Sequence, residues 1–257
     1  MIHASASIDP NARLGEGVHV GAFVYIGPDV EIGDGTVIGP HAVIEGPTRL
    51  GRDNRIGPHA VLGQPPQDTS YAGEPTRLEI GNRNDIREFV TIHRASTKED
   101  QVTRVGSDNM FMAYSHIGHD CIVGDHVTMA NGATLAGHVT VEDHVIIAGL
   151  CAIHQFARIG MFAMLGGGTM APKDIPPYAM ASGNHAKLYG LNRRGLQRNG
   201  FSGEEIRQVR QAYRILFQSA LRLEQALERI EDDTSLDSAR VAHLVRFIRD
   251  SKRGVTR

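Results

Sequence analysis

Residues 123–141 read Val-Gly-Asp-His-Val-Thr-Met-Ala-Asn-Gly-Ala-Thr-Leu-Ala-Gly-His-Val-Thr-Val. Within this stretch Val123, Met129, Leu135 and Val141 follow one another at every sixth position. Hexapeptide periodicity is typical of a parallel β-helix, in which each unit contributes one short strand and each coil stacks on the previous one. The stretch therefore predicts a solenoid built from short strands.

The same period extends in both directions along the chain. The other places are held by Ile8, Leu14, Val20, Ile26, Ile32, Ile38, Ile44, Leu50, Ile56, Leu62, Ile80, Ile86, Ile92, Val105, Phe111, Ile117, Ile147, Ile153, Ile159, Leu165 and Ala171. Three units complete one triangular coil, so residues 18 apart are expected to lie above one another, separated by the inter-strand spacing of about 4.8 Å. The fifth place of a unit is nearly always small, as at Ala42 and Ala133, and Cys121 and Cys151 occupy this place. We interpret both cysteines as core residues.

Two interruptions and one change of pattern divide the chain. Residues 64–79 and 94–104 break the period, and loops that interrupt a solenoid tend to gather on one working face. After Pro176-Pro177 the period stops and the pattern becomes helical, with a capping box at Ser202 to Glu205 and further helices over about 222–232 and from about 237. The sequence thus predicts a β-helix over residues 1–185, with the two inserted loops, and a small α-helical domain over residues 186–257.

Composition excludes several classes of protein. The chain has 257 residues, no tryptophan and two cysteines, which are too few for a disulfide framework. No apolar run reaches the roughly 20 residues that span a bilayer, and the first residues do not resemble a signal peptide, so we expect a soluble, cytoplasmic protein without stable membrane insertion. The net charge of −2 and the absence of a phosphate-binding glycine loop give no case for nucleic acid. Residues 186–257 contain 15 Lys plus Arg and 9 Asp plus Glu, a net charge of +6. This basic end could dock an acidic partner, or its charged residues could simply form the solvated faces of the helices.

Histidines gather in the stretch Ser-His-Ile-Gly-His-Asp, residues 115–120. The period places His119 and Asp120 in the third and fourth positions of their unit, so both side chains are expected to project outward. Gly137 and Gln155 then lie above His119, and His138 lies above Asp120. Fourth-place histidines elsewhere in the chain could simply occupy corners of the solenoid.

Two kinds of chemistry suit this cluster. His116, His119 and His138 could be part of a zinc site, which needs three or four converging ligands. Alternatively, a neutral imidazole at His119 could act as general base on a hydroxyl group, because its pKa near 6.5 matches neutral pH. A backbone N–H beside Gly137 would then be a natural donor to a tetrahedral oxyanion.

Seven motifs together resemble the acyl-carrier-protein:UDP-N-acetylglucosamine O-acyltransferase family, over essentially the whole chain. These motifs are Tyr71-x-Gly-Glu-Pro-Thr76, Ile86-Arg-Glu88, Val90-Thr-Ile-His-Arg94, His116-Ile-x-His-Asp-Cys121, Asn131-x-Ala-Thr-Leu-Ala-Gly-His138, His154-Gln-Phe156 and Gly183-Asn-His-Ala186. The resemblance implies a left-handed winding of the β-helix and a homotrimer with its active sites in the clefts between neighbouring β-helices. It also implies transfer of an (R)-3-hydroxyacyl group from acyl carrier protein to the 3-hydroxyl of UDP-N-acetylglucosamine, as the first step of lipid A biosynthesis, with no metal or other cofactor.

The resemblance also implies roles for individual residues. His119 would be the base, Asp120 would orient it, and Gly137 would give the oxyanion N–H. The substrates would be lined or bound by Gln67, Asp68, His93, His116, His138, His154, Gln155, Gly167, His185, Asn192 and Arg198. Arginine suits a diphosphate because its planar fork binds two oxygens at once.

Three positions depart from the family pattern: Ser70 stands where a lysine is usual, Arg194 where an acidic residue is usual, and Asn199 where an arginine is usual. We infer that contacts to the nucleotide or to the carrier protein are rearranged. Gly167 matches the floor of the family's acyl pocket, and a glycine there leaves room for a longer acyl chain, although Met164 or Met170 could still block it.

Three other functions compete with this interpretation. A zinc enzyme similar to the gamma-class carbonic anhydrases would use the histidines as ligands. The N-acyltransferase that acts later in the same pathway shares the β-helix but carries an additional N-terminal domain, for which a period starting at Ile8 leaves no room. A noncatalytic hexapeptide scaffold would have no activity for His119→Ala to remove.

Overall fold

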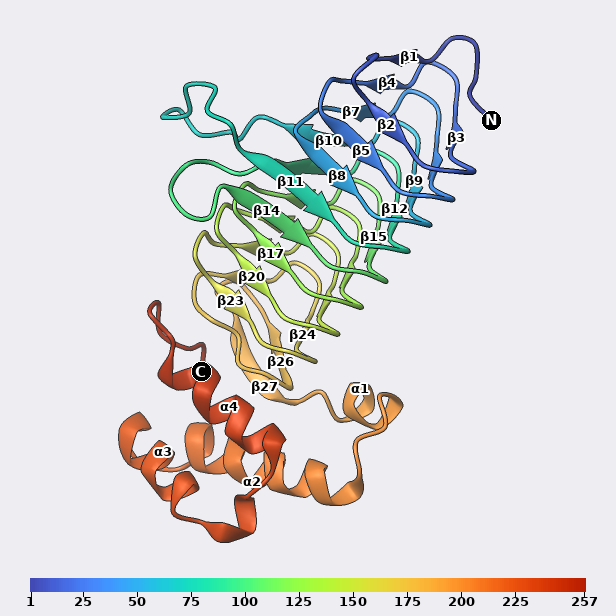
Figure 1. The fold of residues 1–257 in the computed structure, drawn as a ribbon. Helices are drawn as coiled ribbons and strands as arrows, with labels where there is room; N and C mark the ends of the chain where they lie inside the picture. The colour runs from blue at the N-terminus through green and yellow to red at the C-terminus, as the bar shows by residue number, and fades with distance from the viewer.

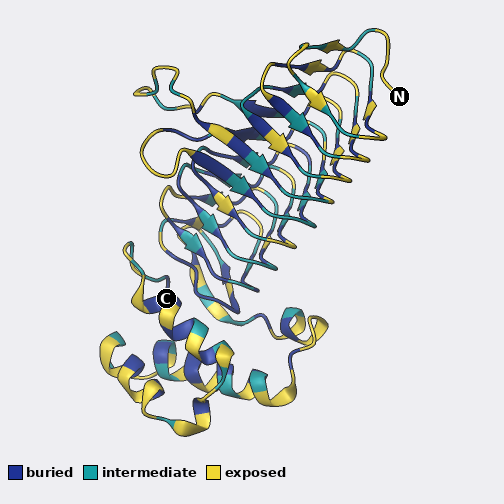
Figure 2. Cartoon of the chain, in the orientation of Figure 1, coloured by how far each residue is buried: buried dark blue, intermediate teal, exposed yellow.

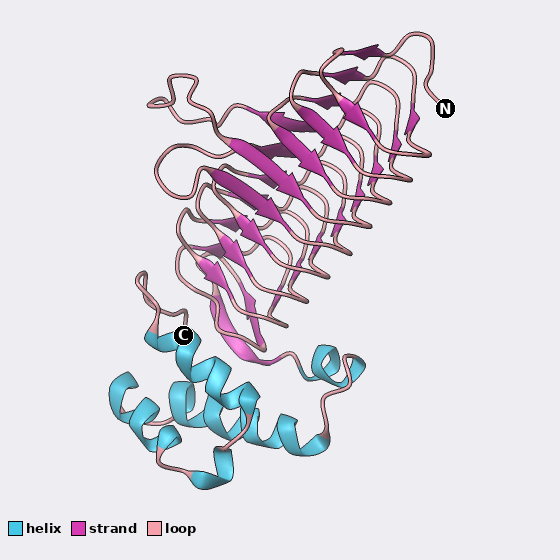
Figure 3. Ribbon diagram, viewed as in Figure 1, coloured by secondary structure: helices cyan, strands magenta, loops and turns pink.

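The computed structural model describes residues 1–257, and its strands are short and wind into a triangular prism (Figures 1 and 3). The nine-stranded sheet contains β1 (Ser7–Ile8), β4 (Tyr25–Ile26), β7 (Val43–Ile44), β10 (Val61–Gln64), β13 (Thr91–His93), β16 (His116–Ile117), β19 (Thr134–Leu135), β22 (Ala152–Ile153) and β25 (Met170–Ala171). The eight-stranded sheet contains β2 (Arg13–Leu14), β5 (Val30–Ile32), β8 (Thr48–Leu50), β11 (Arg77–Ile80), β14 (Val102–Val105), β17 (Ile122–Val123), β20 (Thr140–Val141) and β23 (Arg158–Ile159). The ten-stranded sheet contains β3 (His19–Val20), β6 (Val37–Ile38), β9 (Arg55–Ile56), β12 (Asp85–Ile86), β15 (Met110–Phe111), β18 (Thr128–Met129), β21 (Ile146–Ile147), β24 (Met164–Leu165), β26 (Ala179–Ser182) and β27 (Lys187–Leu191).

Each strand pairs in parallel with the strand one coil away. Ser7 pairs with Tyr25 and Thr128 with Ile146, so the register repeats every 18 residues as the hexapeptide period predicts. The residues at the predicted aliphatic places form one elongated core that includes Ile26, Ile117 and Leu135, all fully buried. Figure 2 shows that buried stretches recur from coil to coil along the solenoid. Full burial of one such side chain contributes about 1.5–3 kcal/mol, so every coil adds its own share of stability.

Both cysteines lie inside this core, as predicted. The Cys121 Sγ donates to the carbonyl of Ala136 at 3.1 Å, and burial raises the pKa of the Cys121 thiol to about 12. Burial also raises the pKa of Cys151. Neither thiol therefore ionises at neutral pH.

Two inserts interrupt the winding at the same corner, where the chain passes from the nine-stranded to the eight-stranded sheet. Residues 65–76 separate β10 from β11, and residues 94–101 separate β13 from β14, so both inserts are shorter than the ranges that the sequence predicts. The pairing interval grows to 30 residues across the first insert and to 25 across the second, yet the rungs on either side remain aligned. Both loops project from one edge of the solenoid (Figure 1).

The corners adopt an unusual backbone conformation for residues with side chains. Eighteen non-glycine residues have φ between 54° and 67°, and many of them occupy the fourth place of a hexapeptide. At one corner Phe23, His41, His59, Phe89 and Tyr114 form a continuous stack with ring centroids between 4.8 and 5.0 Å apart. His41 and His59, which hold fourth places, therefore occupy a corner of the solenoid.

The chain ends in a cluster of helices at one end of the solenoid (Figure 3). They are α1 (Arg193–Arg198), α2 (Gly203–Gln218), α3 (Leu223–Glu231), the 3-10 helix η1 (Thr234–Leu236) and α4 (Ala239–Arg249). The strand β27 pairs antiparallel with β26 and ends at Leu191, beyond the predicted boundary at residue 185. A second core joins the helices to the last coils through Phe162 and Tyr178. None of the helices combines the length and apolar character needed to cross a bilayer.

Candidate active site

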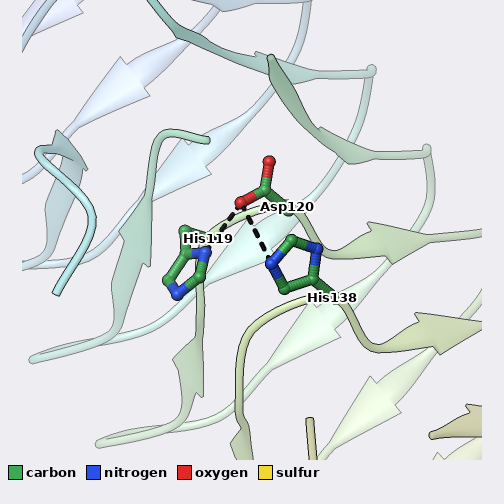
Figure 4. A group of neighbouring side chains, drawn as sticks. All are labelled: His119, Asp120 and His138. Atoms are coloured by element: carbon green, nitrogen blue, oxygen red, sulfur yellow. Dashed lines mark hydrogen bonds and ion pairs between the residues drawn. The ribbon is translucent and has the colours of Figure 1, made fainter. Parts of the chain in front are cut away.

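The centre of the candidate site is the pair His119 and Asp120, at the corner between β16 and β17 (Figure 4). His119 Nδ1 lies 2.7 Å from Asp120 Oδ2. Burial alone would raise the pKa of Asp120, but hydrogen bonds from His119 and Ser96 outweigh this effect and hold it below its usual value. A carboxylate can only accept hydrogen bonds, so the proton of a neutral His119 ring is on Nδ1. The Nε2 atom is left with a lone pair, which is the state that a general base requires.

Asp120 is held from several directions. Its Oδ2 accepts hydrogen bonds from the Ser96 backbone N–H at 3.0 Å and from the Ser96 hydroxyl at 2.7 Å, and its own N–H donates to Thr103 Oγ1 at 2.8 Å. Sequence periodicity predicts that Asp120 and His138 project outward, but the structure buries both. The reason for this difference is the second insert, which lies over the corner and contributes Ser96 to it.

Gly137 lies directly over the His119 ring, as the 18-residue register predicts. A Cβ atom at this position would lie 2.6 Å from His119 Cε1 and 2.7 Å from His119 Nε2. The φ angle of Gly137 is not in the left-handed region, so the ring rather than the backbone demands a glycine here. The N–H of Gly137 makes no hydrogen bond within the chain and is free to donate to a ligand.

His138 stands beside the pair on the next coil. Its ring meets the His119 ring edge to face, with centroids 5.2 Å apart and an interplanar angle of 88°. On its other side it stacks on Phe156, with centroids 4.4 Å apart. His138 Nε2 lies 3.7 Å from Asp120 Oδ2, and Nδ1 lies 3.3 Å from Glu99 Oε2 in the second insert.

His93 and His116 form a second pair of imidazoles on the paired strands β13 and β16. Their ring centroids are 5.0 Å apart, and Thr91 Oγ1 is hydrogen-bonded to His116 Nδ1 at 2.7 Å. Burial, together with the nearby His116 and His119, lowers the pKa of His93 to about 4, and burial and His119 lower the pKa of His116. Both rings are therefore neutral at pH 7 and do not add positive charge next to His119.

The remaining predicted residues lie at increasing distance from this centre. In the first insert Gln67 is exposed, and Asp68 is half-buried and paired with Lys98 at 2.6 Å. The hydrogen bond from Lys98, with others from Ser70, holds the pKa of Asp68 well below its usual range. Exposed residues on the later coils are His154, Gln155, Gly167 and His185.

Two predicted residues belong to the helical end. Asn192 is buried and caps α1: its Oδ1 accepts from the Gly195 N–H at 3.1 Å, and its Nδ2 donates to the Phe162 carbonyl at 3.0 Å. Its side chain thus already has a structural role. Arg198 is exposed in the last turn of α1.

Ser96, Lys98 and Glu99 are residues of the site that sequence reasoning did not identify. All three lie in the second insert, where the hexapeptide period gives no position for a side chain. The only available signal was that both inserts were expected on one working face.

One group of side chains has donor atoms close enough to share a metal ion. The ligand atoms of His119, Asp120 and His138 all lie within 4.8 Å of one another. The zinc hypothesis names His116, His119 and His138, but the third member of this group is Asp120 and not His116. The Nδ1 atom of His116 is instead hydrogen-bonded to Thr91 Oγ1.

The chain is similar to known proteins over its whole length. The family model of UDP-N-acetylglucosamine O-acyltransferase, domain 2, matches residues 174–256, and the bacterial transferase hexapeptide model matches residues 11–46, 29–64 and 103–137. The acyl-[acyl-carrier-protein]–UDP-N-acetylglucosamine O-acyltransferase of Herminiimonas arsenicoxydans is 49% identical over 260 residues, covering 100% of this chain and 99% of the relative.

Solved structures give the same result. The UDP-N-acetylglucosamine acyltransferase of Francisella novicida superposes with a TM-score of 0.97 at 36% identity, covering 100% of this chain and 94% of the other. The corresponding enzyme of Bacteroides fragilis gives a TM-score of 0.97 at 40% identity, with 100% of both chains covered. These matches confirm the parallel β-helix with a small helical end that the sequence pattern predicts, and the left-handed winding that the family resemblance implies.

Proposed function

The chain belongs to the family of acyl-[acyl-carrier-protein]–UDP-N-acetylglucosamine O-acyltransferases, and on this premise we propose that it acylates UDP-N-acetylglucosamine with His119 as the general base. The acyl group is an (R)-3-hydroxyacyl chain carried by acyl carrier protein, and the acceptor is the 3-hydroxyl of the sugar. The reaction is the first step of lipid A biosynthesis. The observation that carries the role of His119 is its 2.7 Å contact with Asp120, which leaves Nε2 unprotonated over the bare backbone of Gly137.

The chemistry follows from these two atoms. A sugar hydroxyl is too weak an acid to attack an acyl group unaided, so His119 Nε2 takes its proton as the oxygen bonds to the acyl carbon. The resulting imidazolium is stabilised by the Asp120 carboxylate. The negative charge that develops on the acyl oxygen is stabilised by the free N–H of Gly137. The proton then passes from His119 to the leaving thiolate of the carrier protein, which restores the neutral base.

We place the substrates on the residues that surround this centre. His93, His116 and His138 line the sugar, with Gln67 and Asp68 above them, and His154 and Gln155 continue the wall. Arg198 and Asn192 contact the diphosphate. The hydrogen bonds by which Asn192 caps α1 hold the Asn192 side chain at the start of that helix. Gly167 and His185 border the acyl chain. A Cβ atom added at position 167 would have only the Gly149 carbonyl oxygen within 4 Å, at 3.6 Å, and this open space supports a pocket for chains of roughly 12 to 16 carbons.

The proposed partners are acyl carrier protein and two further copies of the chain, in the cytoplasm. Arg193, Arg210 and Arg214 form no ion pair within the chain and surround a cavity of about 160 Å³ beside Tyr213. Such unpaired cations suit an acidic carrier protein. Apolar corner residues such as Phe23, Tyr114 and Leu150, which are 62%, 63% and 72% exposed, support contact between β-helices in a homotrimer.

A transfer assay tests the function. The purified protein receives UDP-N-acetylglucosamine and 3-hydroxyacyl carrier proteins with chains of about 10, 12, 14 and 16 carbons, with and without a chelator. We expect transfer that survives the chelator, prefers the longer chains and falls by a factor of roughly 100 or more in His119→Ala. His3→Ala removes an exposed histidine that lies outside both the candidate site and the corner stack, so it is the matched control and keeps its activity.

The assay also separates the competing functions. Transfer that the chelator abolishes would support a metal site at His119, Asp120 and His138. Absence of transfer with every donor would contradict the acyltransferase. Transfer to the 3-amino analogue of the sugar alone would correct the acceptor, and a preference for the 10-carbon donor would contradict the pocket argument.

A further inference from the structure

The second insert contains a four-residue segment, Ser96 to Glu99, that contacts the candidate site at several points. Ser96 binds Asp120, Lys98 binds Asp68, and Glu99 lies against His138. Three side chains within four residues are thus directed at three different site residues. The loop connects β13 to β14, which pair with β16 and β17, so it stands one coil before the corner of His119 and Asp120 and reaches that corner through these contacts.

The contact made by Ser96 is the most buried of the three. Ser96 is 3% exposed and the Asp120 side chain is 2% exposed. The Ser96 hydroxyl and N–H both donate to Asp120 Oδ2, the same oxygen that binds His119 Nδ1, while Asp120 Oδ1 has no partner. Ser96 therefore determines which way the carboxylate faces, and through it the direction of the His119 ring.

Glu99 acts on the neighbouring ring. Its Oε2 lies 3.3 Å from His138 Nδ1, an atom that is buried and has no hydrogen bond of normal geometry. Because His138 packs edge to face against His119, movement of His138 would open space beside the base. Glu99 closes this side of the site.

Lys98 connects the two inserts. Its Nζ lies 2.6 Å from Asp68 Oδ2, and Asp68 also accepts hydrogen bonds from the Ser70 N–H and hydroxyl. The second insert is therefore attached to the corner below it and to the first insert beside it.

We propose that Ser96, Lys98 and Glu99 are positioning residues that hold the His119–Asp120 pair in its reactive geometry, an inference that rests on the proposed acyl transfer. The segment acts as a clamp formed by the chain itself. Ser96 sets the carboxylate, Glu99 sets His138, and Lys98 keeps the loop in place. None of the three touches the reacting atoms.

Steady-state kinetics of three single variants test this proposal. Ser96→Ala removes one of the two hydrogen bonds that Ser96 donates to Asp120, and we expect kcat to fall roughly tenfold with little change in the KM for UDP-N-acetylglucosamine. Ser96→Thr keeps a hydroxyl and restores most of the loss. Thr97→Ala removes an exposed hydroxyl from the same loop and is the matched control, with unchanged kcat. Unchanged kcat in Ser96→Ala, or failure of threonine to restore it while the melting temperature stays normal, would overturn the role of Ser96.

A second measurement does not depend on activity. Diethyl pyrocarbonate modifies accessible imidazoles, and mass spectrometry gives the rate at each histidine. In the unmutated protein His138 should react much more slowly than the exposed His3. Ser96→Ala, Lys98→Ala and Glu99→Ala should each raise the His138 rate roughly fivefold, because the loop opens more often, and Thr97→Ala should not. Equal rates in all four variants would overturn the clamp. If the unmutated protein makes no product, the proposed function fails, and these rates still decide whether the segment holds the site.

Discussion

Gly137→Ala tests the geometry of the site most directly, because it adds a single carbon next to the proposed base. The added Cβ would lie 2.6 Å from His119 Cε1. Carbon atoms in contact prefer a separation of about 3.5–4.0 Å, so the ring has to move by about 1 Å. The hydrogen bond of 2.7 Å to Asp120 opposes this movement.

Two effects of different size are expected. A misplacement of about 1 Å in a catalytic group costs about 100-fold in rate, which corresponds to about 2.7 kcal/mol in the activation free energy. Overpacking at the same point should lower the free energy of unfolding by about 1–3 kcal/mol. The N–H of residue 137 is retained in alanine, so a loss of rate reports on the ring and not on the oxyanion donor.

The assay is a double-mutant cycle with His119→Ala. The free energy of unfolding is measured by urea denaturation for the unmutated protein, the two single variants and the double variant, and kcat is measured for the unmutated protein and Gly137→Ala. If the imidazole is what excludes a side chain at residue 137, the alanine destabilises the protein with His119 present and has almost no effect without it.

Either of two results would refute this reasoning. Equal destabilisation in both backgrounds would mean that the backbone, and not His119, requires glycine at this position. A Gly137→Ala protein with kcat within about twofold of the unmutated value would mean that the ring position does not limit the reaction.

Three further predictions concern other parts of the chain. The pKa of His93 is about 4 in the folded protein and about 6.5 in the unfolded protein. Between pH 6.5 and 4 the unfolded state therefore binds one more proton, so the free energy of unfolding falls as the pH drops through this range. Urea titrations at several pH values should show a smaller fall in His93→Gln, and an identical fall would contradict the assigned pKa. Because burial raises the thiol pKa values of Cys121 and Cys151, neither should react with a disulfide reagent at pH 8 until the protein unfolds, and a rapid reaction of the folded protein would contradict their burial. Gly167→Met should shift the donor preference towards shorter acyl chains in the transfer assay without changing the melting temperature. An unchanged donor preference would contradict the placement of Gly167 in the acyl pocket.

The parts of the fold that follow from local repetition could be predicted from the sequence. The return of an aliphatic residue at every sixth position predicts the strands, their parallel pairing and the 18-residue register, because each rung depends only on its own hexapeptide. The capping box at Ser202 is also local, and both of its hydrogen bonds with Glu205 are present. The short helix α1 was not predicted, since Arg193 to Arg198 has no amphipathic repeat of useful length and begins at the cap formed by Asn192.

The candidate site could be predicted only in part, for the same reason. The register places Gly137 over His119 and His138 over Asp120, and the structure brings these four residues together. The burial of Asp120 depends on where the second insert folds, and an aperiodic loop gives no register from which to infer this. The contacts of Ser96 and Glu99 are set by tertiary packing of that loop, so they became visible only in three dimensions.

The inserts at the corner of the solenoid imply a particular kind of evolvability. Each coil contacts little besides its two neighbours, and insertions that stretch the pairing interval to 30 and 25 residues leave the rungs aligned. New segments can therefore arise at this edge without disturbing the rungs around them, and each segment can acquire side chains that reach the chemistry. The same independence means that the number of coils before the site is adjustable in steps of one coil, so protein length and catalytic geometry can change separately in this architecture.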